Sequence, residues 1–266
     1  MRRNRLRELI KKGLPTIGTR VISIWPGIVE VIGHTGEIDY VEFLGEYASW
    51  DLHDLDNFAR ATELFPMSSM MKVDQDPRGF IAQRALGSGI QNILFTDIRT
   101  VEDARECVRI VKPETPELKG IHGCHMRRDV GYVLDVGSAD YVKAMDDAVI
   151  AIMIEKKGAI DRLEEILSVE GIDMVQFGPA DYSLSIGLPG QRSHPEVKDA
   201  QLKTIKKALE KGIRPRVELT GKEDQKQIQA YIDLGVRDFS LPSDLIILYG
   251  WLKENAGELR KTLSKI

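Results

Sequence analysis

Short apolar runs alternate with amphipathic segments along most of the chain. The apolar runs are rich in Val, Ile, Met and Phe and show little apolar–polar alternation, which is typical of strands buried on both faces of a parallel sheet. They span residues 19–24, 38–44, 68–74, 91–97, 148–155, 173–179, 214–219 and 237–242. Eight such strands separated by helices predict a closed (β/α)8 TIM barrel rather than an open, doubly wound sheet.

The segments between the apolar runs carry helical periodicity and helix-end signals. The clearest helices are expected at residues 51–64, 100–111, 159–169, 194–212 and 222–235. Thr100, with Asp103 three residues later, forms an approximate capping box. Gly171, Gly212 and Gly235 each follow a helical run, where a glycine commonly ends the helix. No GxGxxG or GxxxxGK[ST] motif follows the first strand, so neither a dinucleotide-binding fold nor a P-loop is supported.

The length of 266 residues fits one (β/α)8 domain, since such barrels commonly contain about 250 residues. We therefore expect a single domain over residues 1–266 with a C-terminal helix at about 244–264. Residues 113–147, between the fourth and fifth strands, are longer and more polar than a barrel requires. Long connections are usually functional or disordered, and we expect this loop to start at the C-terminal mouth of the barrel.

Composition and charge argue against several classes of partner. The chain has 37 Lys and Arg residues against 41 Asp and Glu residues, a net charge of −4, whereas a nucleic-acid-binding surface requires a clustered basic excess. The basic N-terminus predicts an amphipathic helix with Leu6, Leu9 and Ile10 on one side, and no apolar segment follows it as in a secretory signal. No apolar run reaches about 18 residues, so no membrane span is expected. Two cysteines, Cys107 and Cys124, indicate a reducing cytoplasm.

Polar residues at the C-terminal ends of the strands are the catalytic candidates in a (β/α)8 barrel. Glu155 and Asp181 follow neighbouring strands, and Mg²⁺ or Mn²⁺ commonly binds one or two carboxylates together with water and substrate oxygens. Alternatively, Glu155 pairs with Lys72 or Lys156 as an ion pair at the barrel end. The other candidates at strand ends are Glu46, Tyr47, Asp74, Lys157, Glu218 and Asp244.

Four segments of the chain resemble the HpcH/HpaI family of class II 2-oxo-acid aldolases. GIDMVQFGPADYSLSIGLPGQRSHPEV is similar to the family's GPADLS-type loop and its continuation, and MIEKKGAIDRLEEILSVEG is similar to the family's QIET segment. LGEYASWDL matches the DGEH region, and MMKVDQDP matches the strand that carries the family's arginine. The resemblance covers most of the chain and implies a metal-dependent barrel enzyme.

The resemblance also implies roles for individual residues. Glu155 and Asp181 would bind a divalent metal, for which Mg²⁺, Mn²⁺ and Co²⁺ remain open, and Glu46 would hold a water beside it. The backbone of Gly178, Pro179, Ala180 and Asp181 would bind the substrate carboxylate. The family further implies a homo-oligomer, a hexamer or trimer of dimers, in which a terminal helix is exchanged between neighbours.

The sequence departs from the family at the general base. The catalytic His of DGEH is Tyr47 here, and its two supporting Asp residues are Leu44 and Leu86. A free phenol titrates near pH ~10 and a free imidazole near ~6.5, so Tyr47 would require a lowered pKa to act as the base. The family's arginine is Lys72, which keeps the positive charge and loses the bidentate geometry.

The long loop contains two further candidate features. His122, Cys124 and His125 form a short cluster that lacks a fourth metal ligand. Arg127 and Arg128 suggest a lid whose guanidinium groups, Arg127 in particular, meet an anionic substrate tail. The alternative is a solvated, charged loop without a role in binding.

Three functions remain after this comparison. The first is a metal-dependent carbon–carbon lyase of the retro-aldol type that acts on a small-molecule 2-oxo acid and releases a pyruvate-like product. The second is an oxaloacetate-type decarboxylase that uses the same metal-assisted enolate chemistry without a base. The third is a non-catalytic barrel that binds a 2-oxo acid. Tyr47 and Lys72 favour the second and third, whereas the joint presence of Glu46, Glu155 and Asp181 favours an enzyme.

Overall fold

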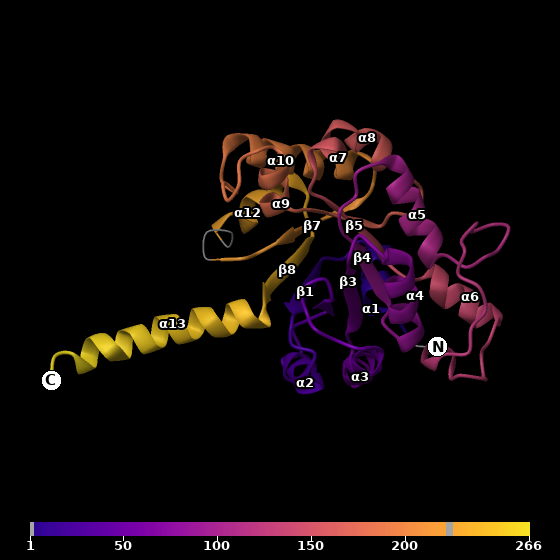
Figure 1. The fold of residues 1–266 in the computed structure, drawn as a ribbon, viewed down its shortest axis with the longest axis horizontal. Coiled ribbons are helices and arrows are strands. Elements are labelled where there is room, and N and C mark those ends of the chain that lie inside the picture. Colours follow the sequence, from indigo (N-terminus) through magenta and orange to yellow (C-terminus); the bar gives the residue numbers. More distant parts are fainter. Residues whose placement is uncertain (1–2, 222–225) are drawn as a thin grey trace.

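Eight parallel strands close into a barrel in which each strand pairs with the next and β8 pairs with β1 (Figure 1). The computed structural model describes residues 3–221 and 226–266. Every residue of β2 to β6 is buried, which confirms the predicted (β/α)8 fold and explains the missing alternation. The strands are β1 (Thr16–Val21), β2 (Tyr40–Leu44), β3 (Ser68–Val73), β4 (Asn92–Phe95), β5 (Ile150–Ile154), β6 (Met174–Phe177), β7 (Arg214–Glu218) and β8 (Asp238–Ser243).

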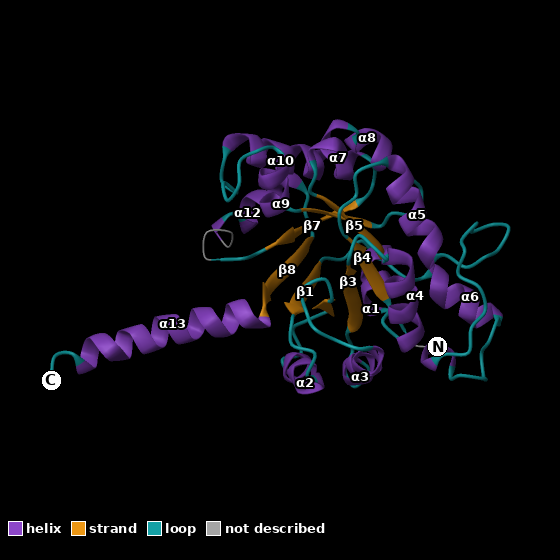
Figure 2. Cartoon of the chain, in the orientation of Figure 1, coloured by secondary structure: helices purple, strands orange, loops and turns teal. Residues whose placement is uncertain are grey.

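Helices surround the strands on the outside of the barrel (Figure 2). The predicted capping box at Thr100 is confirmed, whereas the helix expected at 159–169 is divided at Arg162. The helix expected at 222–235 is observed over 228–234, and its first four residues lie outside the described part of the chain. The helices are α1 (Arg5–Lys11), α2 (Pro26–His34), α3 (Leu52–Thr62), α4 (Arg78–Ser88), α5 (Val101–Val111), η1 (Arg128–Val130), α6 (Ala139–Asp146), α7 (Lys157–Asp161), α8 (Leu163–Ile166), α9 (Pro179–Ser185), α10 (Pro195–Glu210), α12 (Ile228–Leu234) and α13 (Asp244–Leu263).

The first strand starts earlier than its apolar pattern predicts. It begins at Thr16, which pairs with Asp238 of β8, and the hydroxyl of Thr16 donates a 2.6 Å hydrogen bond to that carboxylate. Arg214 of β7 binds the same carboxylate at 2.7 Å. A polar network therefore extends β1 beyond the apolar residues that the sequence pattern detects.

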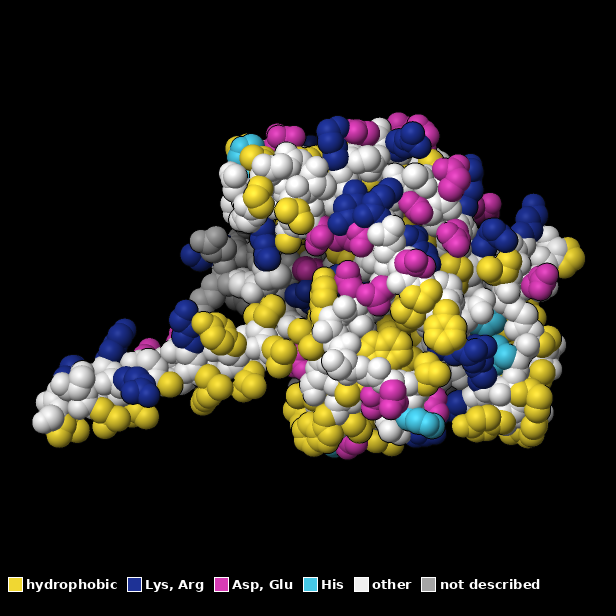
Figure 3. Space-filling view, in the orientation of Figure 1, with side chains coloured by type: hydrophobic (Ala, Val, Ile, Leu, Met, Phe, Trp, Pro, Cys, Tyr) yellow, Lys and Arg dark blue, Asp and Glu magenta, His cyan; other side chains and the backbone are white. Residues whose placement is uncertain are grey.

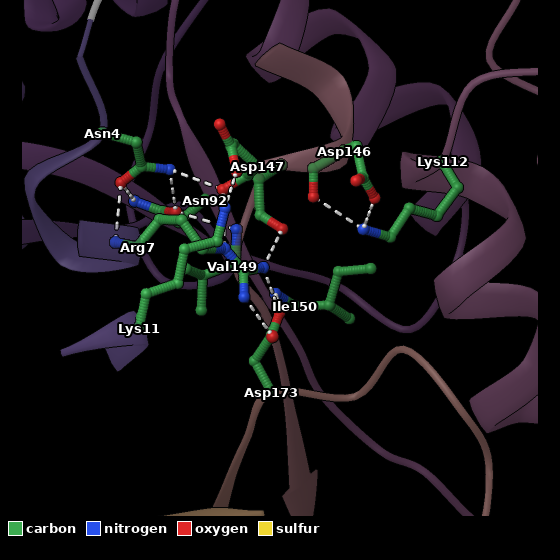
Figure 4. A network of polar contacts seen from close by, with 11 residues as sticks. Asn4, Arg7, Lys11, Asn92, Lys112, Asp146, Asp147, Val149, Ile150 and Asp173 are labelled. Carbon is green, nitrogen blue, oxygen red and sulfur yellow. Dashed lines mark hydrogen bonds and ion pairs between the residues drawn. The ribbon is translucent and has the colours of Figure 1, made fainter. Parts of the chain in front are cut away.

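Helix α1 closes the N-terminal end of the barrel. Leu6 packs inside the barrel among buried residues such as Met70 and Met174, which confirms the predicted amphipathic helix. Figure 4 shows the polar contacts around this end: Arg7 binds both carboxylate oxygens of Asp173, and Asn4 donates to Asn92 at 2.8 Å. This sealed end leaves the opposite, C-terminal end of the strands for a functional site.

The prediction for residues 113–147 is wrong in its placement. The segment begins after α5 and ends before β5, and it contains η1 and α6. Because α5 runs antiparallel to β4, the segment starts at the N-terminal end of the barrel, where the carbonyl of Asp147 accepts a hydrogen bond from Asn4 at 3.0 Å. Within one chain, this segment therefore cannot cover the C-terminal mouth.

Helix α13 extends away from the barrel at the C-terminus (Figure 1). None of its residues is buried, and apolar side chains are distributed along its length (Figure 3). Leu245, Ile247, Trp251 and Leu252 are 48–62% exposed. Among the described residues no helix combines the length and apolar character needed to cross a membrane.

Candidate active site at the C-terminal ends of the strands

A cavity of about 590 Å³ lies at the C-terminal ends of the strands. Residues from neighbouring strand ends meet there, although they are distant in the sequence. Most of the predicted site residues line it, namely Tyr47, Lys72, Glu155, Gly178, Pro179, Ala180 and Asp181. Glu46 contacts this group through Lys72, and Arg127 is absent from the cavity lining.

Glu155 follows β5 and is held tightly by its surroundings. The side chain is buried, and the backbone N–H of Asp97 donates a 2.8 Å hydrogen bond to Oε1. A Cβ atom at Gly178 would lie only 2.4 Å from Oε2. A side chain at position 178 would therefore displace the Glu155 carboxylate, and glycine leaves that carboxylate in place.

Burial raises the pKa of Glu155 to about 7. The Asp97 amide and the ammonium of Lys72 oppose this rise, whereas the charges of Asp181 and Asp97 add to it. Without a bound divalent cation, the Glu155 carboxyl would therefore be about half protonated at neutral pH. A divalent cation at this position would favour the ionised form.

Asp181 lies in the first turn of α9, which begins directly after β6. Its Oδ1 is 3.2 Å from Nζ of Lys156, and the same ammonium is 2.6 Å from Oδ1 of Asp97. The predicted alternative, an ion pair of Glu155 with Lys72 or Lys156, is not formed within the described part of the chain: Lys156 binds Asp181, and Lys72 binds Glu46. Burial lowers the pKa of Lys156, but the hydrogen bonds to Asp97 and Asp181 together outweigh burial, so the pKa is raised.

Tyr47, Lys72 and Glu46 form a second polar group at the ends of β2 and β3. Nζ of Lys72 donates to the Tyr47 hydroxyl at 2.5 Å and lies 2.7 Å from the Glu46 carboxylate. Burial lowers the pKa of Lys72, but the contacts with Tyr47 and Glu46 raise it by more. The net effect is a raised pKa, so the ammonium stays charged. The pKa of Tyr47 is raised, mainly by burial of its hydroxyl and against the effect of Lys72.

The donor set at Glu155 and Asp181 fits a hard divalent cation. Both ligand candidates offer carboxylate oxygens beside an open cavity, and the missing Cβ of Gly178 allows the Glu155 carboxylate to take its place there. No group of three or more His, Cys, Asp or Glu side chains in the described residues could hold a metal. The remaining ligands of a cation would accordingly be water and substrate oxygens, as is common for Mg²⁺.

The sequence interpretation did not identify three charged residues of the barrel interior, namely Arg20, Glu42 and Arg216, although Glu218 was among its candidates. Arg20 of β1 lines the cavity and lies 2.8 Å from Glu218 of β7, which also accepts a 2.6 Å hydrogen bond from Gln176. Arg216 and Glu42 pair with each other and are completely buried. The available signal was the placement of charges inside apolar runs, because barrel interiors are normally filled by bulky apolar side chains.

The loop residues lie outside this site. Nη1 of Arg127 donates to the backbone carbonyl of Gln83 on α4 at 2.6 Å. Nε2 of His122 is 3.2 Å from Nδ1 of His125, whose other ring nitrogen is 2.8 Å from Asp129. The histidines thus form a buried chain with a carboxylate, and neither they nor Arg127 line the cavity.

Comparison with known proteins identifies the family of this barrel. The profile of HpcH/HpaI aldolase/citrate lyase matches residues 34–236, which include both β2 and β6 and the loops that follow them. The chain belongs to this family. As a member it is an enzyme that acts as a lyase.

Individual relatives in the HpcH/HpaI family are named as aldolases. Hydroxypyruvate/pyruvate aldolase of Roseobacter denitrificans is 28% identical over 253 residues, 92% of this chain and 94% of the relative. 2-Keto-3-deoxy-L-rhamnonate aldolase of Escherichia coli is 30% identical over 196 residues, 73% of this chain and 71% of the relative. A solved family structure from Burkholderia cenocepacia has a TM-score of 0.87 at 23% identity and covers 97% of this chain and 100% of its own, which supports the fold.

Proposed function

We propose that this enzyme is a divalent-metal-dependent carbon–carbon lyase that cleaves a small 2-oxo acid and releases a pyruvate-like product. The observation that carries the proposal is the pair of carboxylates, Glu155 and Asp181, beside one cavity and opposite the charged Lys72. The aldolases among its relatives support the retro-aldol class. Mg²⁺, Mn²⁺ and Co²⁺ all accept such oxygen ligands.

In this proposal each residue has a distinct task. Glu155 and Asp181 would hold the cation, which polarises the carboxylate and 2-oxo oxygens of the substrate. Within the Gly178 to Asp181 segment, the backbone N–H groups of Ala180 and Asp181 would bind the substrate carboxylate, because the first turn of a helix presents N–H groups without intrahelical partners. Gly178 would bring the backbone close to the ligand, since its own N–H donates to the carbonyl of Ile154. Lys72 would stabilise the negative charge that develops on the 2-oxo oxygen when the C3–C4 bond breaks.

Tyr47 is poorly suited to remove the proton of a substrate 4-hydroxyl. Its raised pKa keeps the phenol protonated at neutral pH, and its oxygen already accepts a hydrogen bond from Lys72. We therefore assign Tyr47 to orienting Lys72 and donating to the substrate. Glu46, paired with the same ammonium, would orient a water as the base.

A second candidate is favoured by the same observation. Decarboxylation of an oxaloacetate-like acid releases CO₂ without removal of a hydroxyl proton, so it needs no base. A protonated Tyr47 and a charged Lys72 satisfy this reaction as well as the first.

Substitution Tyr47→Phe separates the two reactions because it removes only the hydroxyl. General acid–base assistance is typically worth about 10²–10⁴-fold. If Tyr47 donates or accepts a proton in cleavage, the variant should lose aldol activity within that range and keep oxaloacetate decarboxylation. Steady-state rates with Mn²⁺, oxaloacetate and a panel of 4-hydroxy-2-oxo acids provide the measurement. A parent enzyme that turns over none of these substrates with any divalent metal would refute the proposal.

We also propose that the enzyme is a homo-oligomer, a hexamer or trimer of dimers, in the cytoplasm. Full burial of one Leu or Ile side chain is worth about 1.5–3 kcal/mol, and α13 leaves several of them exposed. A second copy of the chain is the occupant that family membership supports. Both Cys107 and Cys124 are free thiols, which favours a reducing compartment.

A further inference from the structure

Asp97 has an unusual backbone conformation directly beside the carboxylate of Glu155. It follows β4 by two residues, and its φ of 55° lies in the left-handed region. Residues other than glycine rarely adopt this region, and Asp and Asn tolerate it best. The conformation directs the backbone N–H of Asp97 to Oε1 of Glu155 at 2.8 Å. The turn after β4 therefore fixes one of the two proposed metal ligands.

The side chain of Asp97 acts on the other proposed ligand through a lysine. Nζ of Lys156 lies 2.6 Å from Oδ1 of Asp97 and 3.2 Å from Oδ1 of Asp181. The lysine side chain is only 18% exposed. Glu155, Asp181 and Asp97 thus bring three carboxyl groups together, and Lys156 is the cation that lies between two of them.

We propose that Lys156 is a built-in counter-ion of Asp181 that the metal displaces, and that Asp97 retains the ammonium when this occurs. Both are positioning residues, and the inference rests on the proposed metal site. Before the metal binds, the ammonium reduces the repulsion among the carboxylates and keeps Asp181 at the cavity. Of the two contacts of Lys156, the shorter one, with Asp97, would be kept when the metal binds, and the longer one, with Asp181, would be lost.

This arrangement has a measurable cost for metal affinity. The ammonium, held by Asp97, would remain beside Asp181, whose carboxylate would bind the incoming cation, and like charges repel. Near a protein surface, neighbouring unit charges interact strongly enough to change an equilibrium by about tenfold or more. The metal should consequently bind less tightly than it would with a neutral residue at position 156.

Calorimetric titration of the metal-free enzyme with Mn²⁺ tests this inference. Lys156→Met should tighten Mn²⁺ binding by about tenfold or more. Asp97→Asn retains a residue that tolerates the left-handed backbone, but it should weaken binding because Asp181 then remains as the carboxylate that pairs with the ammonium. In the double variant the Asp97→Asn effect should largely disappear, which gives a non-additive cycle. Lys157→Met is the matched control, since Lys157 is 61% exposed and pairs with Asp161.

The outcomes separate this inference from the proposed function. Mn²⁺ binding that is unchanged or weaker in Lys156→Met, or additive effects in the double variant, would overturn the counter-ion role alone. Loss of binding in a Glu155→Ala, Asp181→Ala variant supports the metal site itself. A parent enzyme that binds no Mn²⁺ would overturn both. Thermal unfolding of each variant, compared with the parent, shows that a change in affinity does not reflect loss of the fold.

Discussion

The buried carboxyl of Glu155 makes the stability of the metal-free enzyme depend on pH. A folded-state pKa of about 7 against the ordinary value of 4.5 means that the folded protein binds this proton more tightly. The stabilisation is fully present below pH ~4.5 and is lost as pH rises through about 7. At 1.36 kcal/mol per pKa unit, the loss amounts to about 3 kcal/mol, most of it between pH 5 and 8.

Glu155→Gln isolates this effect because glutamine stays neutral at every pH and its Oε1 still accepts the hydrogen bond from the Asp97 amide. Urea unfolding in the presence of a chelator, at pH 5 and pH 8 and at one fixed protein concentration, gives both free energies of unfolding. Between pH 5 and pH 8 the free energy of unfolding of the parent should fall by about 2–3 kcal/mol relative to that of the variant. Parallel pH profiles for the two proteins would refute the assignment, and excess Mg²⁺ should reduce the difference.

Three further predictions concern other parts of the structure. Gly178→Ala should weaken Mn²⁺ binding in a calorimetric titration, because a Cβ at 178 meets the Glu155 carboxylate. Gly79→Ala is the control, since a Cβ there would lie at an ordinary 3.7 Å from Ile110. Glu42→Leu should destabilise the barrel by about 3–5 kcal/mol in urea unfolding, since it leaves a buried, unpaired arginine, and adding Arg216→Met should recover much of that loss. Deletion of residues 244–266 should reduce the assembly to smaller species in light scattering, and an unchanged molar mass per particle would contradict the role of α13.

The strands were predictable because burial on two faces leaves a strong compositional signal. Uninterrupted apolar runs identified β2 to β6, all of whose residues are buried. The ends of a strand were less predictable where polar contacts, not apolar ones, define them. Thr16 extends β1 through its hydrogen bond to Asp238, and a polarity pattern cannot distinguish such a residue from a loop residue.

The sequence predicted those residues of the candidate site that lie at the C-terminal ends of strands. Glu155 and Asp181 follow adjacent strands, so topology alone brings them to the same cavity. Asp97 was missed because its contribution is a left-handed backbone that presents an amide, and an aspartate after an apolar run looks like any turn residue. Arg20 and Glu218 pair across β1 and β7, a contact that depends on closure of the barrel.

The misplaced loop shows how topology constrains the interpretation of a long insertion. Four residues of β4 advance the chain by roughly 13 Å, and eleven residues of α5 return it by about 16 Å in the opposite direction. An insertion after a strand therefore lies at the catalytic end of a (β/α)8 barrel, whereas one after a helix lies at the other end, which usually serves stability. Residues 113–147 follow α5, and their contacts with Asn4 and Gln83 agree with that rule. Arg127 consequently cannot reach the cavity of its own barrel. It could reach the cavity of a neighbouring copy only if assembly placed the two copies side by side.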